Sequence, residues 1–181
     1  MKNLFFLFST LSLFLFNSCV KSLETPELIN EEELITTLVV TLNSATESLE
    51  LRYADLDGDG PNTGEYQLED LKANTNYTGT LKFLNETEDP AEDITLEVKE
   101  ESNDHQVFYV VNGLDVVIES TDLDTNGYYL GTEFTLRTST ASTGQLQFIL
   151  RHLPNKPNDG NPSTAGGATD LSVSFPLSII E

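Results

Sequence analysis

The pattern that decides the fold is clearest in residues 171–179, which read LSVSFPLSI. Leucine, valine, phenylalanine and isoleucine occupy every second position there, and serine or proline separates them. A period of two is typical of a strand that buries one face and exposes the other. Leu146, Phe148 and Leu150 show the same alternation in the segment before it. Both segments are therefore predicted to be strands packed on a core.

The alternation extends outward through most of the chain. It predicts further strands in residues 34–42, 49–53, 77–83, 107–111, 114–121 and 128–138. Asn112-Gly113 separates two of these strands and is a strong signal for a tight hairpin. We expect a mainly β fold, namely an immunoglobulin-like antiparallel β-sandwich of about eight strands. A barrel is the second choice.

Two segments depart from the strand pattern. Residues 91–101 are rich in helix formers, with Ile94 and Val98 four positions apart, and predict one short helix. The alternation of Ile94, Leu96 and Val98 leaves a strand as the alternative. Residues 153–169 are a long connection rich in proline. Connections of this length are either disordered or functional, and composition does not distinguish the two.

The first residues have the pattern of a secretory signal that ends at a lipidation site. Lys2 precedes thirteen mostly apolar residues, 4–16, and Ser18 precedes Cys19, the single cysteine of the chain. We predict that Cys19 carries the lipid anchor. The alternatives are a signal cleaved elsewhere, a core segment with a buried cysteine, and a transmembrane anchor. Thirteen residues are too few for the last, since a spanning helix needs about 20.

The predicted domain organisation has three parts. Residues 1–18 are a lipoprotein signal peptide, residues 19–33 are a lipidated flexible tether, and residues 34–181 form the β-sandwich.

The charge of the chain limits its partners. The 181 residues include 30 acidic and 9 basic side chains, which gives a formal net charge of −21. Nucleic acid and bare anionic membrane surfaces are poor partners, because both are polyanions. Divalent cations and basic surfaces fit better. The alternative is that the acidity only keeps an exported protein soluble.

Two acidic loops have the spacing of calcium ligands. Asp55, Asp57 and Asp59 alternate in the first, with Glu65 one residue short of the closing position. The second loop has Asp122, Asp124 and Asn126, and Glu133 stands at the twelfth position. Strand-like flanks exclude an EF-hand. Turn-forming residues explain both loops equally well, and a tight turn at Asn126-Gly127 would leave only a shallow acidic patch.

The two histidines offer an alternative metal site. His105 and His152, with a carboxylate, would suffice for zinc if folding brought them together. A hydrogen-bonded histidine at the sandwich edge is the competing interpretation of His152. We find no nucleophile-elbow serine and no zinc-protease motif, so the chain is not expected to be an enzyme.

Six short segments between residues 33 and 170 are informative as a set. They are residues 33–37 (ELITT), 55–60 (DLDGDG), 77–81 (YTGTL), 104–106 (DHQ), 151–156 (RHLPNK) and 165–170 (AGGATD). The set resembles a family of small lipoproteins from Bacteroidetes cell envelopes, whose members are mostly uncharacterised. Some members are labelled type 1 periplasmic binding fold superfamily proteins, but that fold needs two α/β lobes and a longer chain. The resemblance implies an outer-membrane lipoprotein on the periplasmic face or the cell surface.

These observations lead to two expectations of function. The first is a non-enzymatic, membrane-anchored binding or assembly module of the cell envelope, with calcium as its candidate stabilising ion. The alternative is a lipoprotein that captures a metal or small ligand for an outer-membrane transporter, using His105 and His152. A carbohydrate-active enzyme is the third and weakest reading.

Calcium should raise the melting temperature of metal-stripped protein comprising residues 20–181, because an ion bound only by the folded state stabilises it. The Asp57→Ala substitution should abolish the rise. Zinc stabilisation through His105 and His152 would favour metal capture instead. If calcium, zinc and magnesium all leave the melting temperature unchanged, both acidic loops are turns that bind none of these ions.

Overall fold

The computed structural model describes residues 33–57 and 63–181. Cys19, the predicted lipidation site, and Asp59, a predicted calcium ligand, lie outside these ranges. The elements are β1 (Thr37–Asn43), β2 (Ser48–Ala54), β3 (Glu65–Gln67), β4 (Leu71–Lys72), β5 (Asn76–Asn85), β6 (Glu92–Asp93), α1 (Thr95–Glu100), β7 (His105–Asn112), β8 (Val116–Ser120), β9 (Glu133–Thr138), β10 (Ser142–His152) and β11 (Ala168–Ile180).

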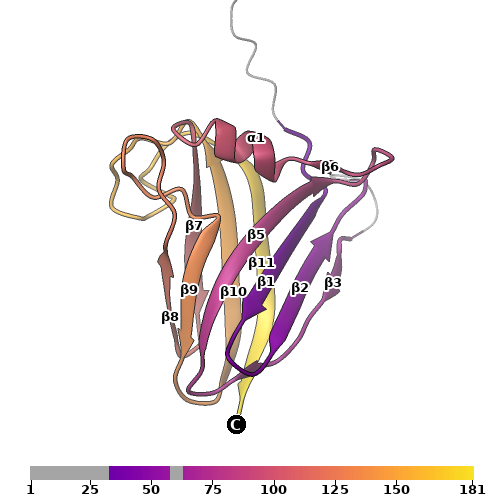
Figure 1. The fold of residues 1–181 in the computed structure, drawn as a ribbon, viewed down its shortest axis with the longest axis vertical. Coiled ribbons are helices and arrows are strands. Elements are labelled where there is room, and N and C mark those ends of the chain that lie inside the picture. The colour runs from indigo at the N-terminus through magenta and orange to yellow at the C-terminus, as the bar shows by residue number, and fades with distance from the viewer. Residues whose placement is uncertain (1–32, 58–62) are drawn as a thin grey trace, which may run out of the picture. The chain divides into compact units, whose positions relative to one another are not determined.

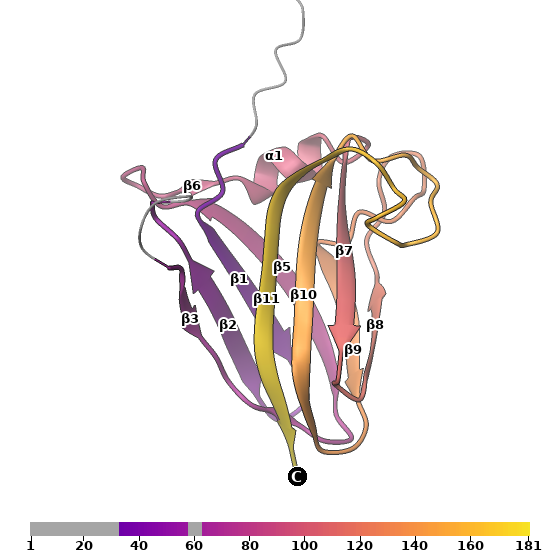
Figure 2. The ribbon, with the colours of Figure 1, turned by 180° about the vertical axis from the view of Figure 1, so that it is seen from behind.

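The strands form two facing sheets. The first has the order β3-β2-β1-β5-β9-β8, with β6 paired to β5, and the second has the order β4-β11-β10-β7. All pairs of strands are antiparallel except β4 with β11, which is parallel. Figures 1 and 2 show the two sheets from opposite sides, with α1 at one end of the sandwich. The predicted mainly β sandwich with one short helix is confirmed.

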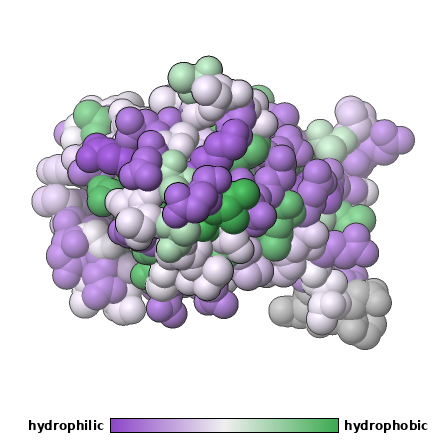
Figure 3. Space-filling model, turned by 90° about the horizontal axis from the view of Figure 1, so that it is seen from below, coloured by the Kyte–Doolittle hydropathy of each residue, from purple (hydrophilic) through white to green (hydrophobic). Residues whose placement is uncertain are grey.

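The surface is largely polar, as the charge of the chain requires. Figure 3 views the end opposite α1, where hydrophilic side chains cover most of the face and small apolar patches lie between them. No helix in the described parts of the chain is long and apolar enough to cross a membrane.

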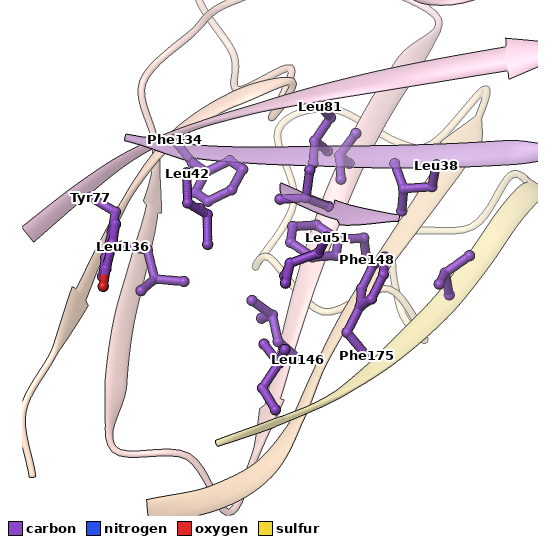
Figure 4. Close-up of a cluster of buried hydrophobic side chains, with 14 of the residues drawn as sticks. Leu38, Leu42, Leu51, Tyr77, Leu81, Phe134, Leu136, Leu146, Phe148 and Phe175 are labelled. Atoms are coloured by element: carbon purple, nitrogen blue, oxygen red, sulfur yellow. The ribbon is translucent and has the colours of Figure 1, made fainter. Parts of the chain in front are cut away.

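The core lies between the sheets and follows the period of two (Figure 4). Leu38, Leu42 and Leu51 project from the first sheet and are fully buried. Phe148 and Phe175 project from the second and pack edge to face, with ring centroids 6.0 Å apart. The apolar side chains at alternating positions of the two sheets thus form one core layer. The burial of their surface is the main favourable term in folding.

The predicted hairpin at Asn112-Gly113 is wrong. β7 pairs with β10 in one sheet and β8 pairs with β9 in the other, so this dipeptide carries the chain between the sheets. Gly113 has φ +81°, and a Cβ there would lie 2.9 Å from the Thr143 carbonyl oxygen. Glycine is therefore required at this position for the positive φ and for the close approach of the two backbone segments. Both requirements apply to a turn between paired strands and to a connection between two sheets.

The long segment after β10 is packed rather than loose. Its main chain is held by hydrogen bonds from Leu153 N–H to Asp104 O at 2.6 Å and from Asn155 N–H to Ala165 O at 2.7 Å. The buried Lys156 Nζ donates to Ser102 O at 2.8 Å. These contacts fix the segment against the end of the second sheet.

Phe148→Ala should lower the free energy of unfolding by about 3–5 kcal/mol, because it removes a buried ring that contacts Tyr109, Phe134 and Phe175. Val117, which is 51% exposed, is the control. Val117→Ala should stay within about 0.5 kcal/mol of the parent. Urea unfolding followed by circular dichroism measures both, and equal losses would contradict this account of the core.

Candidate functional site

The structure brings the two histidines together. His105 begins β7 and His152 ends β10, and the antiparallel register pairs them directly. Their rings stack with centroids 4.7 Å apart and planes 18° from parallel. His105 is fully buried and His152 is 7% exposed. The shared site that the sequence offered as an alternative therefore has its two histidines side by side.

Two buried carboxylates complete the surroundings of His105. Its Nε2 atom lies 3.1 Å from Oε1 of Glu33 and 4.0 Å from Oδ2 of Asp170. The side chains of Glu33 and Asp170 are 6% and 1% exposed. The other ring nitrogen, Nδ1, lies 3.2 Å from the carbonyl oxygen of Glu101. Glu33, at the end of the predicted tether, is thus buried against the domain.

A β-bulge places Asp170. Leu150 is paired with Leu171 and Arg151 with Thr169, so Asp170 is the extra residue on β11. A bulge bends the strand and re-aims the side chain of the extra residue. By simple alternation with Leu171, Asp170 would face outward. The bulge accounts for its burial near His105 instead.

The acidic groups at this end crowd together. Within the described residues, three sets of side chains place one ligand atom each within 4.8 Å of one another. They are Glu33, His105 and Asp170; Glu101, His105 and His152; and Glu33, Glu97 and Glu101. Partial desolvation, and next the nearby carboxylates of Glu33 and Glu101, raise the pKa of Glu97. The crowding of like charges favours a cation here.

The charge on His105 is part of this balance. Burial lowers the pKa of His105, but the hydrogen bond and charge of Glu33, the Glu101 carbonyl and the Asp170 carboxylate outweigh it, so the pKa is raised overall. When it is protonated, His105 offsets part of the negative charge of the carboxylates around it. A divalent cation could fill the same role.

Buried atoms without a hydrogen bond in the described part of the chain include one carboxylate oxygen and one imidazole nitrogen of the site. These two atoms are Oε2 of Glu33 and Nδ1 of His152. Buried polar atoms are normally paired, and an unpaired one carries a desolvation penalty. A carboxylate oxygen and an unprotonated imidazole nitrogen are both electron-pair donors of the kind that bind metal ions.

The second acidic loop uses its carboxylates within the protein. Asp122 Oδ1 accepts a hydrogen bond from Gly131 N–H at 2.8 Å, and its Oδ2 accepts from Thr132 N–H at 3.0 Å. Asp124 Oδ1 accepts from the N–H groups of Asn126 and Tyr128, each at 2.9 Å. These contacts close the turn without an ion.

The remaining predicted ligands of that loop point to other partners. The Asn126 amide donates to Asn103 Oδ1 at 3.0 Å, and Glu133 pairs with Lys99 at 2.9 Å. A two-residue turn at Asn126-Gly127 would place Asp124 opposite Tyr129, but Leu123 lies opposite Tyr129, so the register differs by one residue from the expected one. A shift of one residue exchanges the two faces of a strand. Correspondingly, Leu123 is 55% exposed and Asp124 only 6%.

The first acidic loop is described only in part. Asp55, Asp57 and Glu65 line a hollow of about 380 Å³ together with Arg52 and Thr63. Asp55 Oδ2 accepts a hydrogen bond from the Tyr53 hydroxyl at 3.1 Å. Calcium binding at this loop stays a prediction.

Sequence reasoning missed three members of the histidine site: Glu33, Glu101 and Asp170. Glu33 had been assigned to the tether, and Glu101 to the end of the helix segment. Asp170 had a visible signal, because it is a charged residue directly before the apolar alternation of residues 171–179.

Comparison of the chain with protein-family models, curated proteins and solved structures finds no match. The fold and the site therefore define a class only: a β-sandwich with a buried histidine and carboxylate cluster at one end.

Asp124→Ala should destabilise the protein by about 3–5 kcal/mol, because it leaves the buried Lys156 ammonium without its partner at 3.0 Å. Glu133→Ala breaks the exposed pair with Lys99 and should change stability by less than about 1 kcal/mol. Chemical denaturation at neutral pH compares the two variants. Similar effects would show that burial does not distinguish these pairs.

The ion pair of Asp124 with Lys156 also predicts that the free energy of unfolding depends on pH. Desolvation opposes ionisation of Asp124, but hydrogen bonds from Tyr128 N–H and Lys156 lower its pKa overall. Its stabilising contribution should therefore be complete above the unfolded pKa of about 3.9 and should disappear as the pH falls through the lower folded value. Unfolding free energies of the parent and Asp124→Asn should converge in acid. A constant difference down to the lowest pH would contradict this assignment.

Proposed function

We propose that this chain is a lipid-anchored binding module of the cell envelope whose β-sandwich holds a divalent transition metal ion. The observation that carries the proposal is the convergence of Glu33, His105 and Asp170, three buried metal-ligating side chains, at one end of the sandwich. His152 and Glu101 adjoin them through His105.

The distances suit a small ion with nitrogen and oxygen ligands. Tetrahedral zinc has bonds of about 2.0–2.1 Å, which puts neighbouring ligand atoms roughly 3.3 Å apart. The separations of 3.1 and 4.0 Å from His105 Nε2 to the two carboxylates bracket that value. Calcium prefers six to eight oxygen ligands, so a site built around imidazole favours zinc or a neighbouring transition metal.

The arrangement supports reversible binding. Glu97 and Glu101 are exposed, and both lie in the carboxylate set that shares Glu33 with the buried site. A cation can therefore pass from surface carboxylates to buried ligands. An entry path of this kind is a requirement for a site that fills and empties.

The proposal combines the two sequence-based expectations. The lipid anchor at Cys19 would hold the module at the outer membrane, and the site would bind metal there without catalysis. Delivery of the ion to an outer-membrane transporter is the role that reversible binding favours. A permanently held ion would instead make the site structural.

Zinc should bind the metal-stripped full chain with one ion at the histidine site and raise its melting temperature. Glu33→Gln should weaken zinc at least about tenfold, because loss of even an outer-shell partner weakens metal sites by that much. Glu50→Gln, which changes an exposed glutamate on β2, is the matched control and should bind like the parent. Isothermal titration calorimetry measures the affinities.

Cobalt provides a test of the ligands themselves. Bound Co²⁺ should give visible absorption bands typical of mixed nitrogen and oxygen ligation, and His105→Gln should change them. Zinc affinity that is equal in the parent, Glu33→Gln and His105→Gln would refute the site. Stabilisation by calcium but not by zinc would instead indicate that the ion binds at the loop that begins at Asp55.

A further inference from the structure

A groove lies between residues 121–130 and the long segment 153–167, which Figures 1 and 2 show side by side. Its volume is about 650 Å³. A second hollow of about 470 Å³ follows the edges of β7 and β8 and shares Gln106 and Tyr129 with the first. The two hollows adjoin at these residues and make up a grooved surface, each part of which has the volume of a small-ligand site. We call it the tyrosine groove; its walls include Gln106, Leu123, Tyr128, Tyr129, Asn158 and Asp159.

Exposed apolar side chains gather on one wall of the tyrosine groove. Tyr128 is 38% exposed, Tyr129 is 59% exposed and Leu123 is 55% exposed. These side chains form a small cluster beside the hollow, and a cluster of this kind is a candidate for contact with a ligand. A tyrosine ring offers a flat apolar face and a polar hydroxyl at its edge. That combination matches the C–H faces and the hydroxyl groups of a sugar ring.

The tyrosine wall is held rigidly. Tyr128 N–H donates to Asp124 Oδ1 at 2.9 Å, and Tyr128 O accepts from Asp124 N–H at 2.7 Å. Asp124 is in turn fixed by Lys156 at 3.0 Å, which joins the two sides of the groove. A ligand would therefore meet a wall that is already ordered, and this reduces the entropy lost on binding.

Uncharged amides form the opposite part of the tyrosine groove. Asn158 Nδ2 donates to Gln106 Oε1 at 2.7 Å, and Asn158 Oδ1 accepts from Gly160 N–H at 3.0 Å. Gln106 lines both hollows, and the residue is 8% exposed. Amide and tyrosine groups both donate and accept hydrogen bonds, as sugar hydroxyls require.

Charge excludes anionic ligands. Lys156 is the only cation among the described lining residues, and its ion pair with Asp124 already neutralises it. The net charge of the chain, −21, repels polyanions at longer range. A ligand of the tyrosine groove should therefore not be anionic, and the tyrosine and amide groups favour one that is rich in hydroxyl groups.

We propose that the tyrosine groove binds a neutral oligosaccharide. Tyr128 and Tyr129 pack against its sugar rings, and Gln106 donates to its hydroxyl groups. Binding here involves none of the residues of the proposed metal site.

The test measures oligosaccharide binding by the purified full chain in a detergent without a sugar headgroup. The panel contains hexasaccharides of glucose, mannose and xylose, an oligogalacturonate as the anionic probe, and an oligolysine as the peptide probe. Tyrosine fluorescence provides a direct signal, because the chain has six tyrosines and no tryptophan. Calorimetry gives the affinities.

At least one neutral hexasaccharide should bind, and Tyr129→Ala should weaken it about tenfold, which corresponds to about 1.4 kcal/mol. Val117→Ala, an exposed change outside the tyrosine groove, should bind like the parent and confirms specificity. The milder Tyr129→Phe keeps the ring and should lose less than Tyr129→Ala. Failure of every neutral sugar to bind, binding that ignores both Tyr129 variants, or preference for the galacturonate or oligolysine would each overturn the proposal.

Discussion

The antiparallel pairing of β7 with β10 is the contact on which both the core and the histidine site depend. Along this ladder Phe148 lies opposite Tyr109 and Leu150 opposite Val107, and these pairs extend the apolar layer between the sheets. Two residues further on, the same register places His152 opposite His105. The geometry of the site is therefore set by the same hydrogen bonds that align the core, and a slip of this ladder would disrupt both together.

The carboxylates of the two acidic clusters have different partners. Asp122 and Asp124 are satisfied by main-chain N–H groups and by Lys156, so they stabilise a turn. Glu33 and Asp170 lie instead around His105, with carboxylate oxygens 3.1 and 4.0 Å from its Nε2 atom. The same types of residue thus close a turn in one place and surround a buried histidine in another.

Sequence alone predicted the parts of this structure that follow from local periodicity. The alternation in residues 171–179 and the short helix near Val98 both depend on neighbours in the chain, and both are confirmed. The pairing after Asn112-Gly113 could not be predicted, because that choice depends on which sheet offers an apolar partner. Likewise, the spacing of Asp122 and Asp124 is a local property, whereas the proximity of Glu33, His105 and Asp170 arises from segments far apart in sequence.

The bulge at Asp170 makes the site separable from the scaffold during evolution. Loss of this one residue would bring Thr169 next to Leu171 and restore a regular ladder, because their partners Arg151 and Leu150 are already adjacent. The apolar register of β11 would be unchanged, so the domain could persist while a buried carboxylate disappeared. A single codon deletion or insertion would therefore be enough to remove or add this carboxylate, and the number of residues between Ala168 and Leu171 would record the change.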